Sequence, residues 1–471
     1  MWAARVSRAS SGETVTSTPA LVIAAPASGS GKTTVATGLM GALRQAGHRV
    51  APFKVGPDFI DSGYHTLASG RAGRNLDPVL VGEQLIGGLY AHGTVGADIA
   101  VVEGVMGLFD GRIGKAVSGP AAGSTAHVAG LLGAPVVLVV DARGQSHSVA
   151  ALVHGFTTFD SATRIVGVIL NRVGTARHEH VLRQACEQAG VPVLGAIPRT
   201  AELELPTRYL GLVTAVEYGR RARLAVEAMT ALVARHIDLS AMVAAAASRV
   251  GAPPWDPVTA VGGPMGGRPT VAMAAGKAFS FAYAEHAELL RAVGADVVEF
   301  DPLNQALPEG TNAVLLPGGF PEQFAAELSA NELVRGQLQH LAAAGAPVHA
   351  ECAGLIYLVS ELDGYPMCGV LAGSARFTQR LTLGYRDAVA VADSPLYSVG
   401  RRVAGHEFHR TTVTFTDSYQ PAWVYRGSGR DGHPVRDGVV HGGVHASYLH
   451  THPAATPEAV ARFVAHAAAR S

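Results

Sequence analysis

Short apolar runs alternate with longer stretches in the first half of the chain. From Pro19 onward the apolar runs are ALVIAAP, HRVAPFKV, DIAVVEG, PVVLVVDA and RIVGVILN, and the first intervening stretch, VATGLMGALRQAG, has helical periodicity. Short apolar runs separated by helices are typical of a parallel sheet that is covered on both faces. The N-terminal half is therefore predicted to be a doubly wound α/β domain.

The pattern changes in the middle of the chain. Around residues 236–268 the sequence becomes rich in Ala, Gly and Pro (AAAASRVGAPPWDPVTAVGGPMGGRP), and such a composition neither sustains a helix throughout nor pairs as strands. We therefore place a linker at 241–268, between a first domain at 19–240 and a second domain at 269–471.

The alternation of apolar runs and helical patterns resumes after this segment. Apolar runs occur at PTVAMAAG, DVVEF, AVLLPGG and APVHAEC, and the helical patterns between them are YAEHAELLRAVG and FAAELSANELVRGQLQHLAAAG. These elements predict a second α/β domain that continues to the end of the chain.

Length and composition restrict the classes of function. The 471 residues are enough for two or three domains, and a composition of 48% hydrophobic and 16% charged residues is typical of a folded enzyme. Lys plus Arg and Asp plus Glu both number 37, so no net charge attracts nucleic acid or an anionic membrane. No apolar run reaches the roughly 18–20 residues of a membrane span. We expect neither a nucleic-acid nor a membrane partner.

Cysteine usage and the first residues bear on location. Cys186, Cys352 and Cys368 form no CxxC pair, which argues against a disulfide framework and favours a cytoplasmic location. Residues 1–18 are rich in Arg and Ser but lack the apolar core of a secretory signal. We interpret them as a disordered tail, with a transit peptide as the alternative. The sequence does not define the oligomeric state, for which a homodimer is one candidate.

The most specific local motif is ASGSGKTT at 27–34, between the first predicted strand and the first predicted helix. In a P-loop the backbone N–H groups face the phosphates, the Lys reaches the outer phosphates and the next hydroxyl binds Mg²⁺. Pro26 stands where the usual pattern has its first glycine. The alternative is an ordinary turn that caps a helix. The predicted ATP-binding residues are Gly29, Ser30, Gly31, Lys32, Thr33 and Thr34.

Two acidic segments follow later strands of the same predicted sheet. They are KVGPDFID at 54–61 and EGVMGLFDG at 103–111, and both lie at the strand ends where ligands bind to an open α/β sheet. Carboxylates at these ends can hold Mg²⁺ directly or through water. The alternative is that they are turn residues beside Gly and Pro. Thr33, Asp58 and Glu103 are the predicted Mg²⁺ ligands.

A candidate nucleophile lies in the second half. The segment APVHAECAGLIY, 346–357, predicts a strand, a sharp turn at Cys352 and a helix, which is the layout of a nucleophile elbow. Upstream, LPGGFPE closes another strand with two glycines. Backbone N–H groups of Gly318, Gly319 and Ala353 are the predicted donors to an oxyanion. Cys186 and Cys368 are interpreted as structural.

The nucleophile needs a general base, and the richest histidine segment is HGGVHASYLHTHP at 441–453. His450, at the end of a predicted strand, is the candidate base, whereas His445 and His452 are interpreted as structural. A zinc site is the alternative, but no carboxylate or thiolate accompanies these histidines. A further cluster, GHEFHR at 405–410, is a candidate for binding substrate or orienting the base.

Taken together, these motifs resemble those of one enzyme family. A P-loop with GPDFID and VEGVMGLFDG, followed by LLPGGFPE, ECAG, GHEFHR and SYLHTH, resembles the cobyrinic or hydrogenobyrinic acid a,c-diamide synthases over nearly the whole chain after residue 19. The resemblance implies an ATP-dependent amidoligase domain similar to dethiobiotin synthetase and a class I-type glutamine amidotransferase domain. It also implies the substrates ATP, glutamine and a corrinoid, together with Mg²⁺.

The resemblance implies the following chemistry. Cys352 forms a thioester with glutamine while His450 transfers protons, and the ammonia passes to the other domain. There ATP phosphorylates a corrinoid carboxylate, and ammonia displaces the phosphate to give the carboxamide. Many class I amidotransferases have His-x-Glu at the base, but here Thr451 is followed by His452, so the third member of the triad stays unassigned. The residues expected to position the carboxylate are Asp58, Asp61, Tyr64 and Asp110.

Two alternatives share parts of this pattern. A cobyric acid synthase-like amidase of other corrin side chains has both domains, although the GPDFID segment favours the a,c enzyme. A ParA/MinD-like ATPase switch usually carries Lys where this chain has Ala27, and it has no use for a cysteine elbow. The presence or absence of cobalt in the substrate is not determined by the sequence, and the general resemblance favours the metal-free corrinoid.

Overall fold

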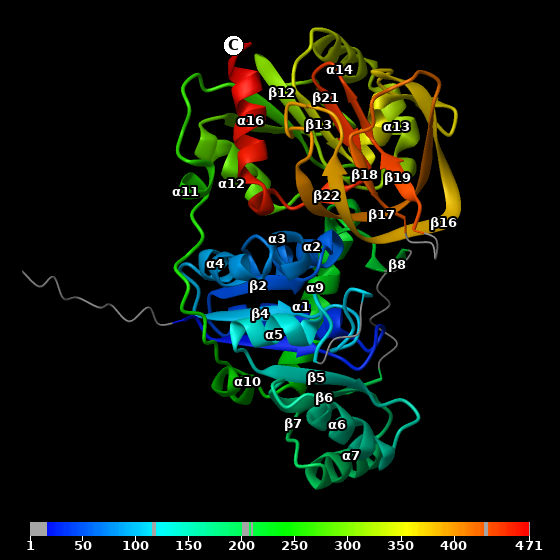
Figure 1. The fold of residues 1–471 in the computed structure, drawn as a ribbon. Helices are drawn as coiled ribbons and strands as arrows, with labels where there is room; N and C mark the ends of the chain where they lie inside the picture. The colour runs from blue at the N-terminus through cyan, green and yellow to red at the C-terminus, as the bar shows by residue number, and fades with distance from the viewer. Residues whose placement is uncertain (1–16, 115–118, 200–206, 209–210, 428–431, 471) are drawn as a thin grey trace, which may run out of the picture.

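The computed structural model describes residues 17–114, 119–199, 207–208, 211–427 and 432–470. It contains two α/β units stacked on each other, with the N-terminal half below and the C-terminal half above in Figure 1. The predicted tail at 1–18 lies outside the described residues except for its last two. Of these, Thr18 accepts a hydrogen bond at 2.5 Å through its carbonyl from the Tyr90 hydroxyl.

The N-terminal unit is built on a seven-stranded sheet in which all strands are parallel, as predicted, in the order β3-β2-β4-β1-β5-β6-β7. Alternate residues of the central strand belong to different cores: Leu21 and Ile23 pack on one face, and Ala20, Val22 and Ala24 on the other. Both faces of the sheet are therefore covered. The strands are β1 (Ala20–Ala24), β2 (Val50–Val55), β3 (Arg74–Leu76), β4 (Ile99–Glu103), β5 (Val136–Asp141), β6 (Ile165–Val173) and β7 (Val193–Pro198).

Helices connect these strands and cover the sheet. Helix α1 (Lys32–Gln45) packs against α9 (Arg220–His236) and α2 (Phe59–Ser69) on one face, while α4 (Glu83–Gly93) and α5 (Thr125–Leu132) pack together elsewhere. Parallel strands place their carboxyl ends on one edge, where the P-loop and both acidic segments lie. The remaining elements of this unit are α3 (Pro78–Val81), α6 (Ser148–Phe159), α7 (Ala176–Gln188), α8 (Ala215–Tyr218), β8 (Thr207–Arg208) and β9 (Gly211–Leu212).

The predicted linker contains more regular structure than its composition indicates. It includes most of α10 (Leu239–Ala245) and all of α11 (Pro257–Val261), and Trp255 is buried against α4. The expectation that this segment does not pair with a strand is wrong at Ala247, which forms an antiparallel bridge with Ala20 of β1. The small Ala side chains allow this close approach, so the segment packs along the N-terminal unit before it crosses to the other one.

The C-terminal unit contains a six-stranded sheet in the order β11-β10-β12-β13-β21-β20, parallel except for β20. The single helix expected at 324–345 is two helices, because the Asn331 side chain accepts a hydrogen bond from the Val334 N–H and starts a second one. The elements are β10 (Thr270–Ala274), α12 (Ala284–Val293), β11 (Asp296–Phe300), β12 (Thr311–Leu316), η1 (Pro321–Gln323), α13 (Ala325–Ala330), α14 (Glu332–Ala343), β13 (Val348–Glu351), α15 (Ala353–Leu358), β20 (Val439–His441), β21 (Val444–Ser447), η2 (Pro453–Ala455) and α16 (Pro457–Ala468).

A further, largely antiparallel sheet lies beside this core and was not predicted. Its two long strands, β16 (Leu371–Ala390) and β17 (Arg402–Phe415), form a ribbon that reaches down to the N-terminal unit (Figure 1). β17 also pairs His406 with His450, which brings the candidate base into this sheet. The other strands are β14 (Val359–Leu362), β15 (Tyr365–Pro366), β18 (Trp423–Arg426), β19 (Pro434–Asp437) and β22 (His450–Thr451).

Polar contacts join the two units. Arg74 of β3 binds Glu285 at 2.5 Å and also Glu288, both on α12, and the burial of Glu285 (2% exposed) takes this ion pair out of water. The Tyr385 hydroxyl of β16 donates to the Asp77 carboxylate at 2.9 Å. Buried charged contacts are sensitive to geometry, so these pairs fix how the units face each other.

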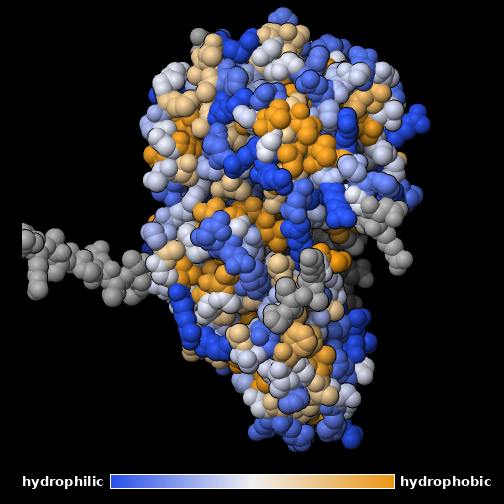
Figure 2. Space-filling model, in the orientation of Figure 1, coloured by the Kyte–Doolittle hydropathy of each residue, from blue (hydrophilic) through white to orange (hydrophobic). Residues whose placement is uncertain are grey.

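The surface is mixed. On the face shown in Figure 2, hydrophilic residues are interspersed with small hydrophobic patches over both units. In the part of the chain that the structure describes, no helix combines the length and apolar character needed to cross a membrane.

Candidate active site

The P-loop lies between β1 and α1, as predicted. Gly29 and Gly31 have φ of 79° and 99°, conformations that glycine adopts without strain. A Cβ at Gly31 would lie 2.2 Å from Nδ2 of Asn171, and that amide donates to the Ser30 carbonyl at 2.9 Å. Asn171, near the end of β6, therefore holds the loop from two strands away in the sheet, although the sequence analysis did not select it.

The two lysines of this region have different surroundings. Lys32 donates to the Met106 carbonyl at 2.5 Å, and burial, then the nearby Lys54, lowers its pKa to about 8. Lys54, on β2, is 3% exposed and lies among carboxylates. Burial would lower its pKa, but the charges of Asp61 and Glu103 outweigh this effect and raise it. Lys54 is therefore a buried cation at neutral pH.

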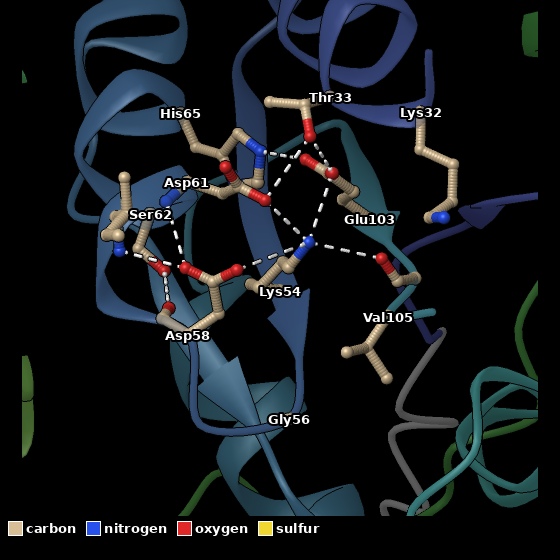
Figure 3. A network of polar contacts seen from close by, with 12 residues as sticks. Lys32, Thr33, Lys54, Gly56, Asp58, Asp61, Ser62, His65, Glu103 and Val105 are labelled. Atoms are coloured by element: carbon tan, nitrogen blue, oxygen red, sulfur yellow. Dashed lines mark hydrogen bonds and ion pairs between the residues drawn. The ribbon is translucent and has the colours of Figure 1, made fainter. Parts of the chain in front are cut away.

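Figure 3 shows Lys54 at the centre of a polar network. Its ammonium lies 2.7 Å from the Asp61 carboxylate, 3.0 Å from Glu103 and 3.1 Å from the Gly104 carbonyl. Glu103 also accepts from the Thr33 hydroxyl at 2.6 Å and contacts His65 at 2.6 Å. Sequence reasoning missed both Lys54 and His65, although Lys54 directly precedes the GPDFID motif.

The acidic residues do not all take the places expected of them. The Asp58 carboxylate accepts from the backbone N–H groups of Ile60 and Asp61, at 2.9 and 3.1 Å, and thus caps α2. Asp61, one turn later, lies 3.3 Å from the Thr33 hydroxyl. The structure therefore brings Thr33 and Glu103 together with Asp61, where the sequence predicted Asp58, because the helix turns Asp61 toward the P-loop.

Two further residues were expected to position the substrate carboxylate, and their surroundings differ from each other. Tyr64 is completely buried, and its hydroxyl donates to the Val213 carbonyl at 2.8 Å, so it packs α2 instead of reaching a substrate. This corrects its expected positioning role. Asp110 is exposed and accepts from the Gly107 N–H at 3.0 Å, close enough to Lys32 to affect its pKa.

The oxygen atoms of Thr33, Asp61 and Glu103 suit Mg²⁺, which prefers carboxylate and hydroxyl ligands and commonly shares its coordination with nucleotide phosphates. Within the described ranges, no three His, Cys, Asp or Glu side chains are arranged as a metal site. This finding also gives no support to the zinc alternative at the C-terminal histidines.

The cysteine elbow forms as the sequence predicts. Cys352 joins β13 to α15 with φ 49° and ψ −96°, an unusual conformation for a residue other than glycine and one that is found at functional turns. Its N–H donates to the Ser447 carbonyl at 2.7 Å. The next residue, Ala353, begins α15, where helix N–H groups have no partner within the helix.

The two glycines after β12 have separate contacts. A Cβ at Gly318 would lie 2.2 Å from Cε1 of His450, so the absence of a side chain makes room for the imidazole. A Cβ at Gly319 would lie 2.0 Å from the Ala278 carbonyl oxygen. Gly319 also lines a small cleft that Cys352 opens into. The other lining residues are Phe320, Pro321, Glu322, Ile356, Leu381, Phe408, His409, Arg410 and Thr411.

His450 is buried beside Cys352, the candidate nucleophile. Burial would lower its pKa, but Cys352 and Glu351 outweigh this effect and raise the pKa to about 10. The Glu351 carboxylate lies 3.6 Å from Nδ1 of His450, an ion-pair distance, and accepts hydrogen bonds at 3.0 Å from the backbone N–H and the hydroxyl of Thr451. Glu351 is therefore the candidate for the third position of the triad, which the sequence left unassigned.

The other histidines and cysteines singled out in the sequence are buried. Burial lowers the pKa of both His445 and His452. Cys186 and Cys368 are buried free thiols. In the GHEFHR cluster, His406 pairs with His450 across two strands, and Glu407 forms an ion pair with Arg386 at 2.5 Å. The cluster thus supports the strand that holds His450.

Two family models match separate parts of the chain. Residues 21–213 match the model of the CobQ/CobB/MinD/ParA nucleotide binding domain, and residues 270–457 match that of the CobB/CobQ-like glutamine amidotransferase domain. The nucleotide-binding match includes the MinD/ParA proteins, but an ATPase switch does not account for the amidotransferase domain.

Full-length relatives cover almost the whole chain. A hydrogenobyrinate a,c-diamide synthase of Mycobacterium tuberculosis is 80% identical over 95% of this chain and 98% of its own length. One from Streptomyces coelicolor is 56% identical over 95% and 97%, and a cobyrinate a,c-diamide synthase of a Synechococcus strain is 38% identical over 94% and 97%. The chain therefore belongs to the family of hydrogenobyrinate and cobyrinate a,c-diamide synthases, in which a nucleotide-binding domain is joined to a glutamine amidotransferase domain.

Proposed function

We propose that this protein uses ATP and glutamine to convert the a and c carboxylates of hydrogenobyrinate, a metal-free corrinoid, into carboxamides in cobalamin biosynthesis. The observation that carries this proposal is the presence, in one molecule, of a buried Cys352–His450–Glu351 site and a P-loop beside Lys54. The first kind of site releases ammonia from glutamine, and the second activates a carboxylate with ATP. The predicted division into 19–240, 241–268 and 269–471 assigns one reaction to each domain.

Glutamine hydrolysis takes place at the elbow. The Cys352 sulfur attacks the side-chain amide carbon, and the tetrahedral oxyanion is stabilised by N–H groups of Ala353 and the Gly318–Gly319 segment. His450, charged below its raised pKa, gives its proton to the leaving ammonia. Water then cleaves the thioester to release glutamate. Glu322 and Arg410 line the cleft and carry charges opposite to those of the α-ammonium and α-carboxylate of glutamine.

Carboxylate activation takes place at the P-loop. The γ-phosphoryl group of ATP is transferred to the corrinoid carboxylate, and ammonia then displaces phosphate from the acyl phosphate to leave the amide. Lys32 and the backbone of 29–34 bind the phosphates, while Lys54 and Asp61 lie where the carboxylate is activated. Mg²⁺, held by Thr33, Asp61 and Glu103 together with phosphate oxygens, would neutralise phosphate charge.

The metal-free acceptor is preferred because the relatives that are 50–80% identical carry the name hydrogenobyrinate a,c-diamide synthase, whereas those at 38–42% carry the name cobyrinate a,c-diamide synthase. ATP, glutamine and the corrinoid are thus the proposed binding partners. Assembly as a homodimer and a cytoplasmic location stay predictions, and light scattering of the purified protein tests the first.

The test is to incubate the purified protein with glutamine, Mg-ATP and either hydrogenobyrinate or cobyrinate, and to measure the products by mass spectrometry. We expect a diamide from hydrogenobyrinate, with one ADP, one phosphate and one glutamate released per amide. Conversion of cobyrinate alone would contradict the choice of acceptor. Products with more than two new amides would favour a cobyric acid synthase-like reaction, and the absence of amide from either acceptor would overturn the proposal.

A further inference from the structure

The imidazole of His450 is held mainly by packing. In the described structure neither ring nitrogen has a hydrogen-bond partner, and the nearest carboxylate, that of Glu351, is at 3.6 Å. Gly318 leaves space for one side of the imidazole ring. Aromatic side chains lie against other parts of the same ring. The orientation of the base therefore depends on the shape of its surroundings, so the residues that pack against it affect catalysis.

One of these aromatic residues comes from the other domain. Phe59, the first residue of α2, has its ring centroid 5.5 Å from that of His450. It stacks on Phe281 at 5.2 Å with an interplanar angle of 9°, and it lies 4.6 Å from Tyr283. Figure 1 shows α2 on the side of the ATP-binding domain that faces the amidotransferase domain. A side chain of the ATP-binding domain thus forms part of the wall around the glutaminase base.

Phe59 is also tied to the activation site through its own backbone. It directly follows Asp58, whose carboxylate caps α2 and lies 3.8 Å from Lys54, and it precedes Asp61 by half a helical turn. Lys54 and Asp61 are ion-paired at 2.7 Å. A shift of this turn on binding of nucleotide or acceptor at Lys54 and Asp61 would therefore move the Phe59 ring relative to His450.

We propose that Phe59 is a positioning residue of the glutaminase site that orients His450 and couples its orientation to the occupancy of the ATP and carboxylate site. Orientation by packing is worth a large factor in rate, since displacement of a catalytic group by about 1 Å can cost about 100-fold. The coupling to the carboxylate site rests on the proposed function, which identifies the acceptor. The effect of Phe59 on glutamine hydrolysis does not depend on that identification.

The test compares Phe59→Ala with Phe59→Tyr, which keeps the ring, and with Phe156→Ala. Phe156, on α6, is a half-buried phenylalanine of the same domain that stacks on Phe109 at 5.7 Å, and it serves as the matched control for loss of an aromatic pair. For each purified variant, glutamate release is measured with and without Mg-ATP and corrinoid, and amide formation is measured with glutamine or with ammonium chloride.

We expect Phe59→Ala to lower kcat for glutamate release at least tenfold with a small change in the KM for glutamine, and to abolish the response of glutamate release to Mg-ATP and corrinoid. Amide formation from ammonium chloride should stay near the wild-type rate, and Phe59→Tyr and Phe156→Ala should resemble the wild type. Wild-type glutamate release by Phe59→Ala would overturn the inference, as would equal loss of glutamine- and ammonia-dependent synthesis. If wild-type protein forms no amide from either nitrogen source, the proposed function fails, whereas the glutamate measurements still test Phe59.

Discussion

The Glu351 carboxylate lies 3.6 Å from Nδ1 of His450, and Glu351 immediately precedes Cys352, the proposed nucleophile. In the proposed mechanism, one strand end therefore supplies both the nucleophile and the acid beside its base. The other oxygen of Glu351 accepts two hydrogen bonds from Thr451, which hold the carboxylate in place. Burial acts against its charge, but contacts with His349 and His450 hold the pKa of Glu351 well below its usual range.

Glu351→Gln should change the pH dependence of glutamine hydrolysis. The raised pKa of His450, about 10, keeps the imidazole charged through neutral pH, so glutamate release should decline only as the pH approaches 10. Removal of one of the two groups that raise this pKa should move the alkaline limb to lower pH by about one unit or more. Rates of glutamate release between pH 6 and pH 10.5 measure this shift, and an unchanged alkaline limb would show that Glu351 does not affect His450.

Cys352→Ser should abolish synthesis supported by glutamine and leave synthesis from ammonium salts, because only the source of ammonia is lost. His450→Ala should have the same effect to a smaller degree. The measurement is amide formation by mass spectrometry with each nitrogen source. Persistent glutamine-supported synthesis by Cys352→Ser would mean that another residue is the nucleophile.

The sequence predicted the strands that carry the sites because apolar runs and glycine-rich turns are local features. The parallel sheet, the P-loop at 27–34 and the elbow at Cys352 all depend on neighbouring residues, and the structure contains each of them. The long β16 and β17 were missed because a two-stranded ribbon, with many residues half-buried, has no clear apolar run to mark it.

The choice among neighbouring polar residues was less predictable. Asp58 and Asp61 belong to one motif, but the start of α2 turns Asp58 into a helix cap and directs Asp61 toward Thr33. Glu351 was not selected because its partner His450 comes close to it through the pairing of β13 with β21, the strand that precedes His450. Such contacts depend on the phase of a helix or on the pairing of distant strands, and neither is apparent in a single sequence.

ATP binding should take up a proton at alkaline pH. The pKa of Lys32, lowered to about 8, leaves this lysine largely neutral in the free protein above pH 8, and bound phosphates favour its charged form. ATP affinity should therefore weaken by up to about tenfold per pH unit above pH 8. Calorimetric titration at pH 8.5 in two buffers of different ionisation enthalpy measures the proton uptake, and equal heats in both buffers would contradict the prediction.

Lys32→Ala should also lose synthesis with both nitrogen sources.

Lys54→Met should destabilise the N-terminal domain more than loss of any exposed lysine. Lys54 is 3% exposed and is the cation that Asp61 and Glu103 share, so its removal leaves two buried carboxylates without their partner. Loss of one member of a buried ion pair typically costs about 3–5 kcal/mol of unfolding free energy. Lys277→Met, at an exposed position, is the matched control and should change stability by less than about 0.5 kcal/mol.

The loss caused by Lys54→Met should also depend on pH. Burial and the charge of Asp58 already raise the pKa of Asp61 well above its usual value, with Lys54 opposing them. Without Lys54 the pKa of Asp61 rises further. A carboxyl whose pKa is higher in the folded state destabilises that state when it is ionised, and the penalty disappears at pH values low enough to protonate it. The difference in unfolding free energy between variant and wild type should therefore be largest near pH 8 and smaller near pH 5. Urea unfolding at both values measures it, and a loss that is equal at pH 5 and pH 8 would mean that the cost of Lys54→Met comes from packing and not from charge.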